Sequence, residues 1–327
     1  MKILVRLPNW LGDMVMSVGA MHQLPYFFPG AEISVIAKKG IHDLLEFFPA
    51  TKHQFIFSKD EHIGWKGLWQ FGKNIKRTEK FDLFLSFPDS FSSAFIGYAA
   101  GAEKRVGYRK EGRNFLLTDA YNKAKGIHRV EEYIQLLELY TGKERQETSV
   151  RLQHCFLKKD YIVININSEA SSRRLTVAKA VEIITAVQSQ AKEIILVGSN
   201  NEKLFVDEVI NHLENKNGIE SVAGQTSLKQ LCEVLASAKL MLSTDSGPAH
   251  LANALGTDTV VLFGAGNENN TAPYNKEAVE TIRLGKLSCE PCMKNICVRF
   301  DTPQCLELLE TDKILSAMKQ KTARYDN

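Results

Sequence analysis

Residues 240–255 decide the fold of this chain, and they read LMLSTDSGPAHLANAL. The segment opens with an apolar run typical of a buried strand and closes with apolar side chains at helical spacing. Between these parts, Gly247 allows a sharp turn and Pro248 suits the first position of a helix, where no amide hydrogen is required. The free N–H groups and the dipole of such a helix bind phosphate oxygens, and His250 is placed to donate to the same group. The alternative is an ordinary turn in which a side chain caps the helix.

The same alternation of strand and helix runs through the whole chain. Short apolar runs rich in Val, Ile, Leu and Phe alternate with amphipathic stretches, which indicates parallel sheets covered by helices on both faces. The expected strands cover residues 2–6, 32–37, 53–58, 81–87, 104–108, 161–166, 193–198, 220–223, 240–244 and 258–263. The expected helices cover residues 14–26, 41–48, 66–79, 90–100, 129–141, 176–190, 227–238 and 311–321. The sequence therefore predicts an α/β fold with doubly wound sheets.

Two domains are expected. The chain has 327 residues, and a prior of about 150 residues per domain suggests two. A polar stretch over residues 143–160 separates the halves. We expect one Rossmann-like domain over residues 1–155 and another over residues 156–327, and we allow for the C-terminal helix to pack back on the first domain. Two such domains facing each other would form a cleft at the carboxyl ends of their strands, where open α/β sheets bind ligands.

The charge balance and the start of the chain exclude several classes of protein. The 41 Lys and Arg residues against 38 Asp and Glu give a net charge of +3, too balanced for a protein that coats nucleic acid. No apolar run approaches the length that crosses a bilayer and no signal-peptide cleavage site is present, so we expect a cytoplasmic protein. The sequence PNWLGD at residues 8–13 lacks the Gly-x-Gly-x-x-Gly pattern of dinucleotide-binding sheets. An NAD-dependent enzyme is therefore disfavoured.

Asp13 is the candidate general base. It follows Gly12 after the first expected strand and precedes an expected helix, and a carboxylate there can take a proton from an attacking hydroxyl. A helix N-terminus lowers the pKa of a carboxyl and so weakens it as a base, and desolvation must offset this effect. The alternative is that Asp13 only caps its helix.

Three further candidates follow strands of the second half. Arg173 and Arg174 come after a Ser-rich loop that begins with Ser168 and Glu169, and paired guanidiniums suit a diphosphate. Glu202 follows the strand expected at 193–198, where it accepts ribose hydroxyls or simply begins a helix.

Four cysteines lie close together near the C-terminus. The spacing of Cys289, Cys292, Cys297 and Cys305 is compatible with zinc or iron, and it is equally compatible with reduced thiols or one disulfide.

Aromatic and basic residues are interleaved over residues 65–80, which read WKGLWQFGKNIKRTEK. Such a segment docks on an anionic membrane leaflet, or it forms an amphipathic helix that packs on its own domain. The sequence leaves both interpretations open.

Taken together, several of these segments match one family. The matching stretches are PNWLGDMVMS at 8–17, GYRKEGR at 107–113 followed by LLT at 116–118, TDSGPAH at 244–250, and the four cysteines. They resemble the bacterial lipopolysaccharide heptosyltransferases, glycosyltransferase family 9, and most closely those of the second inner-core heptosyltransferase type. The resemblance implies a GT-B fold of two Rossmann-like domains. It also implies transfer of heptose from ADP-heptose to the lipopolysaccharide inner core.

Residue by residue, the resemblance implies a role for each candidate. Asp13 would be the general base, and Arg173 would stand where the family usually has a lysine near the donor phosphates. The implied donor-binding set is Ser168, Glu169, Arg173, Glu202, Thr226, Asp245, Ser246, Gly247 and His250. The implied acceptor-binding set is Gly12, Arg109 and Arg113.

The reaction implied by the resemblance inverts the anomeric centre as ADP leaves, and it requires no metal or other cofactor. Fixed cations and a helix N-terminus can neutralise the departing diphosphate in place of Mg²⁺. If a metal is present nonetheless, the four cysteines are its candidates. The implied partners are a nucleotide-sugar donor and a lipid-linked saccharide acceptor, with peripheral contact at the cytoplasmic face of the inner membrane and no nucleic acid.

Two departures from the family pattern lie in the donor half. Ile166-Asn167 replaces a usual Pro-Gly, and Leu175-Thr176 replaces a usual Trp-Pro. The alternatives are therefore a related glycosyltransferase with another donor or a protein acceptor, and a catalytically silent nucleotide-sugar binding module.

Overall fold

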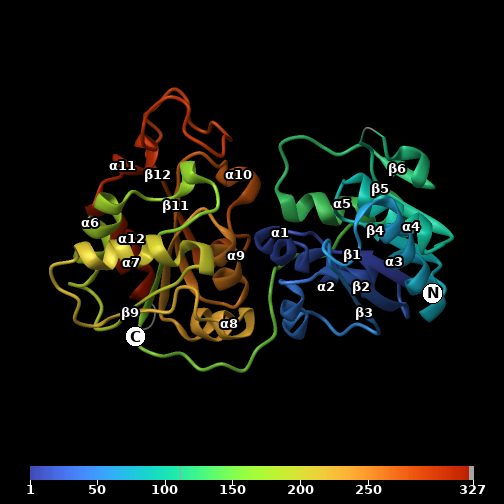
Figure 1. Cartoon of the computed structure of the whole chain (residues 1–327), viewed down its shortest axis with the longest axis horizontal. Helices are drawn as coiled ribbons and strands as arrows, with labels where there is room; N and C mark the ends of the chain where they lie inside the picture. The colour runs from blue at the N-terminus through green and yellow to red at the C-terminus, as the bar shows by residue number, and fades with distance from the viewer. Residues whose placement is uncertain (111, 324–327) are drawn as a thin grey trace. The chain divides into compact units, whose positions relative to one another are not determined.

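The computed structural model describes residues 1–110 and 112–323, so Glu111, which belongs to the matching stretch 107–113, lies outside the described residues. The chain divides into two compact units, Met1–Gln153 and His154–Asn327. The division follows Gln153, two residues before the boundary expected from the sequence. In Figure 1 the first unit runs from blue to green and the second from yellow-green to red.

The first unit is built on one parallel sheet. Its strands are β1 (Lys2–Arg6), β2 (Glu32–Lys38), β3 (Gln54–Phe57), β4 (Leu83–Ser86), β5 (Lys104–Tyr108) and β6 (Asp119–Tyr121). They pair in the order β3-β2-β1-β4-β5-β6, every pair parallel. The central strands carry fully buried side chains such as Leu4 and Leu85, because helices cover both faces of the sheet.

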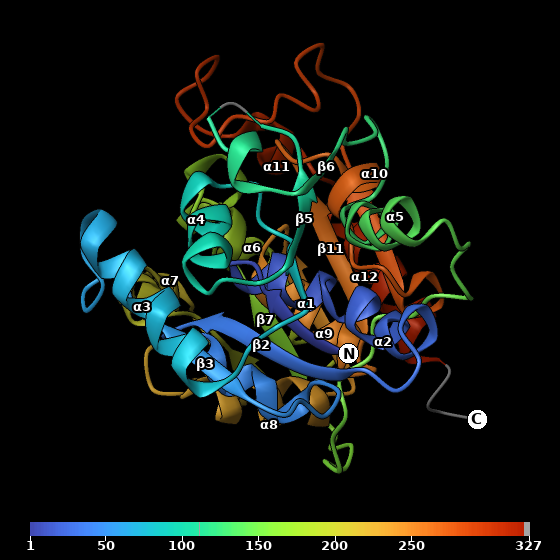
Figure 2. The same ribbon diagram turned by 90° about the vertical axis from the view of Figure 1, so that its right-hand side faces the viewer.

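Four of the α-helices of the first unit pack in two pairs. The helices of this unit are α1 (Leu11–Met16), α2 (Val18–Phe27), α3 (Gly64–Thr78), α4 (Phe91–Ala99) and α5 (Arg129–Thr141), with short 3-10 helices η1 (His42–Phe47) and η2 (Asn114–Leu116). Helix α2 packs against α5, and α3 packs against α4. Figure 2 shows the two pairs on opposite sides of the sheet.

The second unit repeats this plan. Its strands are β7 (Ile162–Asn165), β8 (Ile194–Leu196), β9 (Ile219–Ser221), β10 (Leu240–Thr244), β11 (Asp258–Phe263) and β12 (Val279–Arg283), all parallel in the order β12-β11-β10-β7-β8-β9. Its helices are α6 (Val177–Val187), α7 (Lys203–His212), α8 (Leu228–Ser237), α9 (Gly247–Ala254), α10 (Glu268–Thr271), α11 (Gln304–Glu307) and α12 (Thr311–Thr322). Short 3-10 helices are η3 (Ser171–Arg173), η4 (Asn200–Glu202) and η5 (Lys276–Ala278).

Both sheets have the same topological switch point. In each, the first strand of the unit lies in the middle, between the second and the fourth. The connections that follow the first and fourth strands therefore leave toward opposite faces of the sheet, and this is where doubly wound sheets bind ligands. The switch points lie between β1 and β4 and between β7 and β10. The α/β fold with two doubly wound parallel sheets, predicted from the sequence, is confirmed.

The C-terminal helix α12 packs within the second unit. Ile314 and Met318 are buried in the core of that unit, and α12 contacts β11 and α6. The sequence had left open a packing of this helix on the first unit.

Several elements differ from those expected. The single helix expected over residues 14–26 is two helices, because the Ser17 hydroxyl donates to the Met14 carbonyl at the break and competes with the helical hydrogen bonds. The helix expected at 41–48 is a 3-10 helix. Strands β6 and β12 were not expected; β6 has only three residues, and both lie at sheet edges, where apolar patterning is weak.

Close approach of α3 and α4 depends on Gly72. A Cβ atom added at Gly72 would lie 2.4 Å from the Cβ of Ala99 and 2.9 Å from the backbone nitrogen of Ala100. Both neighbours are small residues of the facing segment, so the two helices meet almost backbone to backbone.

We therefore expect Gly72→Ala to lower the free energy of unfolding by about 1–3 kcal/mol, because forcing the helices apart outweighs the better helix propensity of alanine. Chemical denaturation of the whole protein measures this change. Gln70→Ala, on the exposed side of the same helix, is the matched control and should leave stability nearly unchanged. Equal stability of Gly72→Ala and wild type would contradict the packing described.

Candidate functional site

The switch point of the second unit holds a network of buried polar side chains. Asn165, at the end of β7, donates from Nδ2 to the Ser246 hydroxyl at 2.8 Å and to the Ser243 hydroxyl at 3.3 Å. The Ser168 hydroxyl reaches the carbonyl of Asp245 at 3.5 Å. The loops after β7 and β10, far apart in the sequence, are thereby held against each other.

Asp245 and Arg173 form an ion pair in this network. Arg173 Nη1 lies 3.3 Å from Asp245 Oδ2, and the aspartate is 4% exposed. Gly266 lies directly against the same carboxylate, since a Cβ added there would stand 2.0 Å from Asp245 Oδ2. Burial raises the pKa of the Asp245 carboxyl to about 6, against the lowering effect of the Arg173 and Arg283 guanidiniums. Arg173, the cation of the expected donor set, thus lies beside the Asp245 carboxyl, whose pKa is about 6.

The start of α9 is left without a side-chain cap. Ser246 is the N-cap residue, yet its side chain makes no capping hydrogen bond and donates instead to the carbonyl of Thr244 at 3.1 Å. Pro248 occupies the first turn, as the sequence predicted. The sequence left open that Ser246 or Asp245 caps this helix; the structure shows no side-chain capping hydrogen bond at its N-cap residue Ser246. The backbone N–H groups of this turn remain suited to an anion. His250 is buried one turn further along.

Glu202 and Thr226 follow neighbouring strands of the same sheet. The Gly224 N–H donates to the Gly198 carbonyl at 2.9 Å, which joins the loops after β8 and β9. Glu202 Oε2 accepts from the Ser199 N–H at 2.7 Å and completes a capping box at η4. Thr226 is half-buried and precedes the N-cap residue of α8. Both residues thus lie at the carboxyl edge that also carries Asp245, and Glu202 begins a helix as well.

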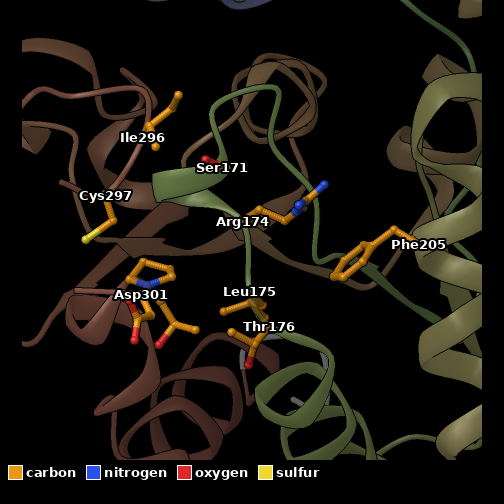
Figure 3. A pocket seen from close by; sticks show the side chains of 10 residues that line it. Ser171, Arg174, Leu175, Thr176, Phe205, Ile296, Cys297 and Asp301 are labelled. Carbon is orange, nitrogen blue, oxygen red and sulfur yellow. The ribbon is translucent and has the colours of Figure 1, made fainter. Parts of the chain in front are cut away.

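Arg173 and Arg174 diverge. Arg174 lies over the ring of Phe205, with its guanidinium carbon 4.8 Å from the ring centroid. Arg174, Leu175 and Phe205 help to line a pocket of ≈ 210 Å³, whose lining Figure 3 shows. The two guanidiniums, expected from the sequence to act as a pair, therefore have different neighbours: Arg173 contacts Asp245 and Arg174 contacts Phe205.

The residues at the two departures from the family pattern, Ile166-Asn167 and Leu175-Thr176, are buried or hydrogen-bonded within the second unit. Asn167 Nδ2 donates to the Val197 carbonyl at 3.0 Å, and the Asn167 carbonyl accepts from the Thr244 hydroxyl, so Asn167 joins β7 to the strands on either side. Thr176 caps α6 by accepting from the Lys179 N–H at 3.2 Å. Leu175 is buried. Each replacement has a structural function of its own.

The switch point of the first unit holds Asp13. Asp13 lies in the first turn of α1, where the N-cap residue is Trp10 and no side chain caps the helix. Its carboxylate accepts from the Tyr133 hydroxyl at 3.4 Å and lies 3.5 Å from Arg129 Nε. Asp13 therefore faces α5 and does not cap its own helix.

Burial raises the pKa of the Asp13 carboxyl, while Arg129 and the Tyr133 hydroxyl lower it. Burial is the largest of these effects, so desolvation does offset the influence of nearby positive charge, as a base in this position requires. Arg129 is itself held by Glu132, with Nη1 and Oε2 2.6 Å apart.

Arg6 supports the loop that carries Asp13. It is 2% exposed, donates from Nη1 to the Ile36 carbonyl at 3.0 Å and binds the Asn9 side chain through Nη2. Burial lowers the pKa of Arg6 to about 10. The PNWLGD loop is thus held through Asn9 by the buried Arg6 guanidinium.

The three residues of the expected acceptor set have different environments. Gly12 lies beside Asp13 in α1, and Arg109 is exposed with Nε donating to the Ala120 carbonyl at 2.9 Å. Arg113 is 0% exposed and donates from Nη1 to the carbonyls of Pro88 and Ser90 at 2.8 and 3.1 Å. As placed, Arg113 has no exposed surface with which to contact an acceptor. It holds the loop after β4, the other side of the switch point.

The four clustered cysteines converge. Cys289, Cys292, Cys297 and Cys305 all line one small cavity of the second unit, and all four are free thiols. Among the described residues, no three His, Cys, Asp or Glu side chains are gathered closely enough to hold a metal ion.

Several residues of the site were not found from the sequence. Tyr133 and Arg129 contact Asp13 from more than a hundred residues away, and an aromatic or basic residue on an expected helix carries no signal of that contact. Gly266 had a signal, the Gly-x-Gly that follows the strand at 258–263, although this stretch lacks the third glycine of a dinucleotide fingerprint.

The fold and its two polar switch points define an α/β protein of the nucleotide-binding type. The family described as glycosyltransferase family 9 (heptosyltransferase) matches residues 68–300, well over half of the chain. The chain therefore belongs to glycosyltransferase family 9, and the resemblance noted in the sequence is confirmed.

Individual relatives in the same family match this chain over most of its length. The chain is 25% identical to lipooligosaccharide heptosyltransferase 2 of Campylobacter jejuni, over 98% of this chain and 99% of the relative. It is 27% identical to lipopolysaccharide heptosyltransferase 2 of Escherichia coli, over 87% and 88%. The solved structure of E. coli ADP-heptose lipopolysaccharide heptosyltransferase II matches its fold with a TM-score of 0.85 and 23% identity, covering all of both chains. Among the described residues, none of the helices is long and apolar enough to span a membrane.

The raised pKa of Asp245 predicts a pH-dependent cost in stability. The unfolded chain releases this proton near pH 3.8 and the folded chain near pH 6, so stability is lost as the pH rises through that window. We expect wild type to lose about 3 kcal/mol relative to Asp245→Asn between acidic and neutral pH. Denaturation of both proteins across this range measures the difference. A difference that does not change with pH would contradict the buried environment of this carboxyl.

Proposed function

We propose that this chain transfers heptose from ADP-heptose to the inner core of lipopolysaccharide. The observation that carries the proposal is the pair of polar switch points: one unit places Asp13 there, and the other places Asp245, Arg173 and the uncapped start of α9. The relatives named above support the choice of donor and acceptor.

The second unit, residues 156–327 in the sequence-based division, would bind the donor. Arg173 and the N–H groups at the start of α9 would bind the diphosphate, since both present positive charge at the same switch point. Asp245, Ser246, Gly247 and His250 would hold the heptose and diphosphate. Glu202 would bind the ribose, Thr226 would lie by the adenine, and Ser168 and Glu169 would border the donor. Charge on the departing ADP is thus neutralised by fixed protein groups, and we propose transfer without a metal ion or other cofactor.

The first unit, residues 1–155, would bind the acceptor. Asp13 would take the proton of the acceptor hydroxyl as its oxygen forms a bond to the anomeric carbon. The bond from that carbon to the diphosphate breaks, and ADP leaves with the electron pair. Attack opposite to the leaving group inverts the anomeric configuration. Gly12 and Arg109 would border the acceptor.

Arg129 and Tyr133 would be positioning residues. Each contacts the carboxylate of Asp13, which is 30% exposed, and together they fix its orientation. Burial raises the pKa of Asp13 more than Arg129 and the Tyr133 hydroxyl lower it, so Asp13 is a stronger base than a fully solvated carboxylate.

The acceptor of the proposed reaction is lipid-linked, so we place the reaction at the cytoplasmic face of the inner membrane, with peripheral contact. The balanced net charge of +3 gives no support to a nucleic-acid partner.

A donor panel tests this function. The protein is mixed with a lipopolysaccharide inner-core acceptor and with ADP-heptose, ADP-glucose or a UDP-sugar, and release of the nucleotide is followed. Among these donors, we expect only ADP-heptose to release its nucleotide in the presence of the acceptor. We also expect ADP to bind more tightly than UDP or GDP, as measured by calorimetry. Release with another sugar nucleotide would show a different donor, and binding of ADP without release on mixing would show a silent binding module.

The same assay tests the metal. We expect full activity in EDTA, because Arg173 and the α9 N-terminus supply the positive charge. Elemental analysis of the purified protein tests the four cysteines in parallel. Activity that is lost in EDTA and restored by a divalent cation would contradict the metal-independent reaction.

The contacts of Asp13 predict a change in pH dependence. Tyr133→Phe removes a hydrogen bond that lowers the pKa of Asp13, and Arg129→Gln removes a charge that lowers it further. Since the base must be ionised, the acidic limb of the kcat/KM profile should move to higher pH in both variants, and less in Arg129→Lys, which keeps the charge. Tyr140→Phe, on the same helix, is the control that should leave the limb in place. An unmoved limb in Tyr133→Phe and Arg129→Gln would show that Asp13 is not the titrating base.

A further inference from the structure

The first unit exposes a cluster of large apolar side chains that the proposed reaction does not use. The cluster, called the aromatic patch below, consists of the exposed residues Ile63, Trp65, Trp69, Tyr98 and Phe115 and the partly buried rings of Phe91 and Phe95, which Trp65, Trp69 and Phe115 contact. Ile63 and Phe115 are 77% and 75% exposed, and Trp65 is 60% exposed. Soluble proteins rarely leave so many large apolar groups in one exposed area without a partner.

The rings of the aromatic patch form one continuous surface. Trp65 contacts Phe91 and Phe95 with ring centroids 4.9 and 5.5 Å apart. Trp69 contacts Phe95 at 6.1 Å and Tyr98 at 6.2 Å. These residues come from α3 and α4, which lie side by side in Figure 2 and meet closely at Gly72. The two helices therefore present their aromatic side chains together.

The core of the unit does not need these tryptophans. Helix α3 already has an inner face, formed by Leu68, Phe71 and Ile75, which is buried against the sheet and α4. Trp65 and Trp69 are exposed, although they lie on the same helix. Packing on its own domain, one of the two interpretations that the sequence left open, explains the inner face of α3 and the ring contacts with α4. It does not explain why Trp65 and Trp69 remain 60% and 40% exposed.

Cations accompany the aromatic patch. Helix α3 carries Lys66, Lys73, Lys76 and Arg77 and has no acidic residue between Gly64 and Thr78. Within the described part of the chain, none of these four cations is paired with a carboxylate. Lys73 lies over the ring of Trp69 at 4.9 Å, and Arg105 lies over that of Tyr98 at 5.7 Å. Positive charge and apolar surface are therefore mixed on one face.

We propose that the aromatic patch and the cations of α3 dock the protein on the surface of an anionic lipid bilayer. Tryptophan and tyrosine partition to the boundary between headgroups and acyl chains, and basic residues beside them bind anionic headgroups. A second copy of this chain fits less well, because a symmetric contact would bring the unpaired cations of both α3 helices together.

The position of the aromatic patch within its unit suits a lipid-linked acceptor. Phe91 begins α4 directly after Ser90, whose carbonyl Arg113 holds at the switch point. The patch thus starts next to the loop that borders the proposed acceptor side of the same sheet. This inference rests on the proposed function only for the statement that the acceptor is lipid-linked.

Flotation of the full-length protein with vesicles tests the proposal. Vesicles of phosphatidylcholine alone are compared with vesicles that also contain phosphatidylglycerol, at low and high salt. We expect binding to the anionic vesicles at low salt, and weaker binding to neutral vesicles or at high salt. Failure of the wild-type protein to bind anionic vesicles would overturn the proposal.

Two double variants separate the apolar and the charged contributions. Trp65→Ser with Trp69→Ser should lower the partition coefficient at least about tenfold, because two interfacial rings are lost. Lys66→Gln with Lys73→Gln should lower it about 25-fold, about fivefold for each cation removed. The matched controls are Leu204→Ser, which changes an 82% exposed residue of α7, and Lys192→Gln with Lys216→Gln, which removes the same charge from the second unit. Equal losses in variants and controls would overturn the proposal.

A water-soluble acceptor distinguishes failure of the membrane-docking proposal from failure of the proposed heptose transfer. With a delipidated acceptor, the tryptophan variant should keep the wild-type kcat/KM, and with acceptor in anionic vesicles its rate should fall in step with vesicle binding. Sedimentation velocity is run on the same samples. If the tryptophan variant abolishes self-association of the wild type and vesicle binding is unaffected, the patch is an interface between copies and the membrane proposal is wrong.

Discussion

The loops after the first and fourth strands of each sheet leave toward opposite faces, and the positions of Asp13, Arg173 and Asp245 depend on that divergence. It opens a polar edge in the middle of a sheet whose central strands are buried, so ligand-binding groups can stand there without disturbing the core. In the first unit the edge receives Asp13, with its loop fixed by the buried Arg6. In the second it receives the Asp245–Arg173 pair and the start of α9. The same topology, used in both units, thus places different polar groups at the two switch points.

Both carboxylates at these edges balance burial against a neighbouring guanidinium. Burial raises the pKa of each carboxyl, and the arginine beside it lowers that pKa. For Asp13 the opposing group is Arg129, supported by Glu132, and for Asp245 it is Arg173. Each arginine lowers the pKa of the carboxyl beside it, and it reaches that carboxyl from a distant part of the sequence.

The sequence was enough for the architecture because local patterns determine it. The apolar run and Gly247-Pro248 predicted β10 and α9, and the switch-point motifs at 8–17 and 244–250 indicated Asp13 and Asp245. Long-range contacts were out of reach. Nothing in the segment around Arg113 indicates that its guanidinium is buried against the carbonyls of Pro88 and Ser90, and nothing separates Arg173 from Arg174 before the fold directs one to Asp245 and the other to Phe205. Short edge strands such as β6 could not be predicted, because three residues are too few to show the alternation of apolar and polar side chains of a strand.

The most direct measurement of the central claim compares heptose transfer by wild type and by Asp13→Asn, with ADP binding followed by calorimetry on the same preparations. Removing the base should slow transfer by about a hundredfold or more, the usual contribution of general-base catalysis, while ADP binding to the second unit stays as in wild type. A transfer rate within a few-fold of wild type, at unchanged ADP affinity, would contradict the role given to Asp13 and with it the assignment of the first switch point.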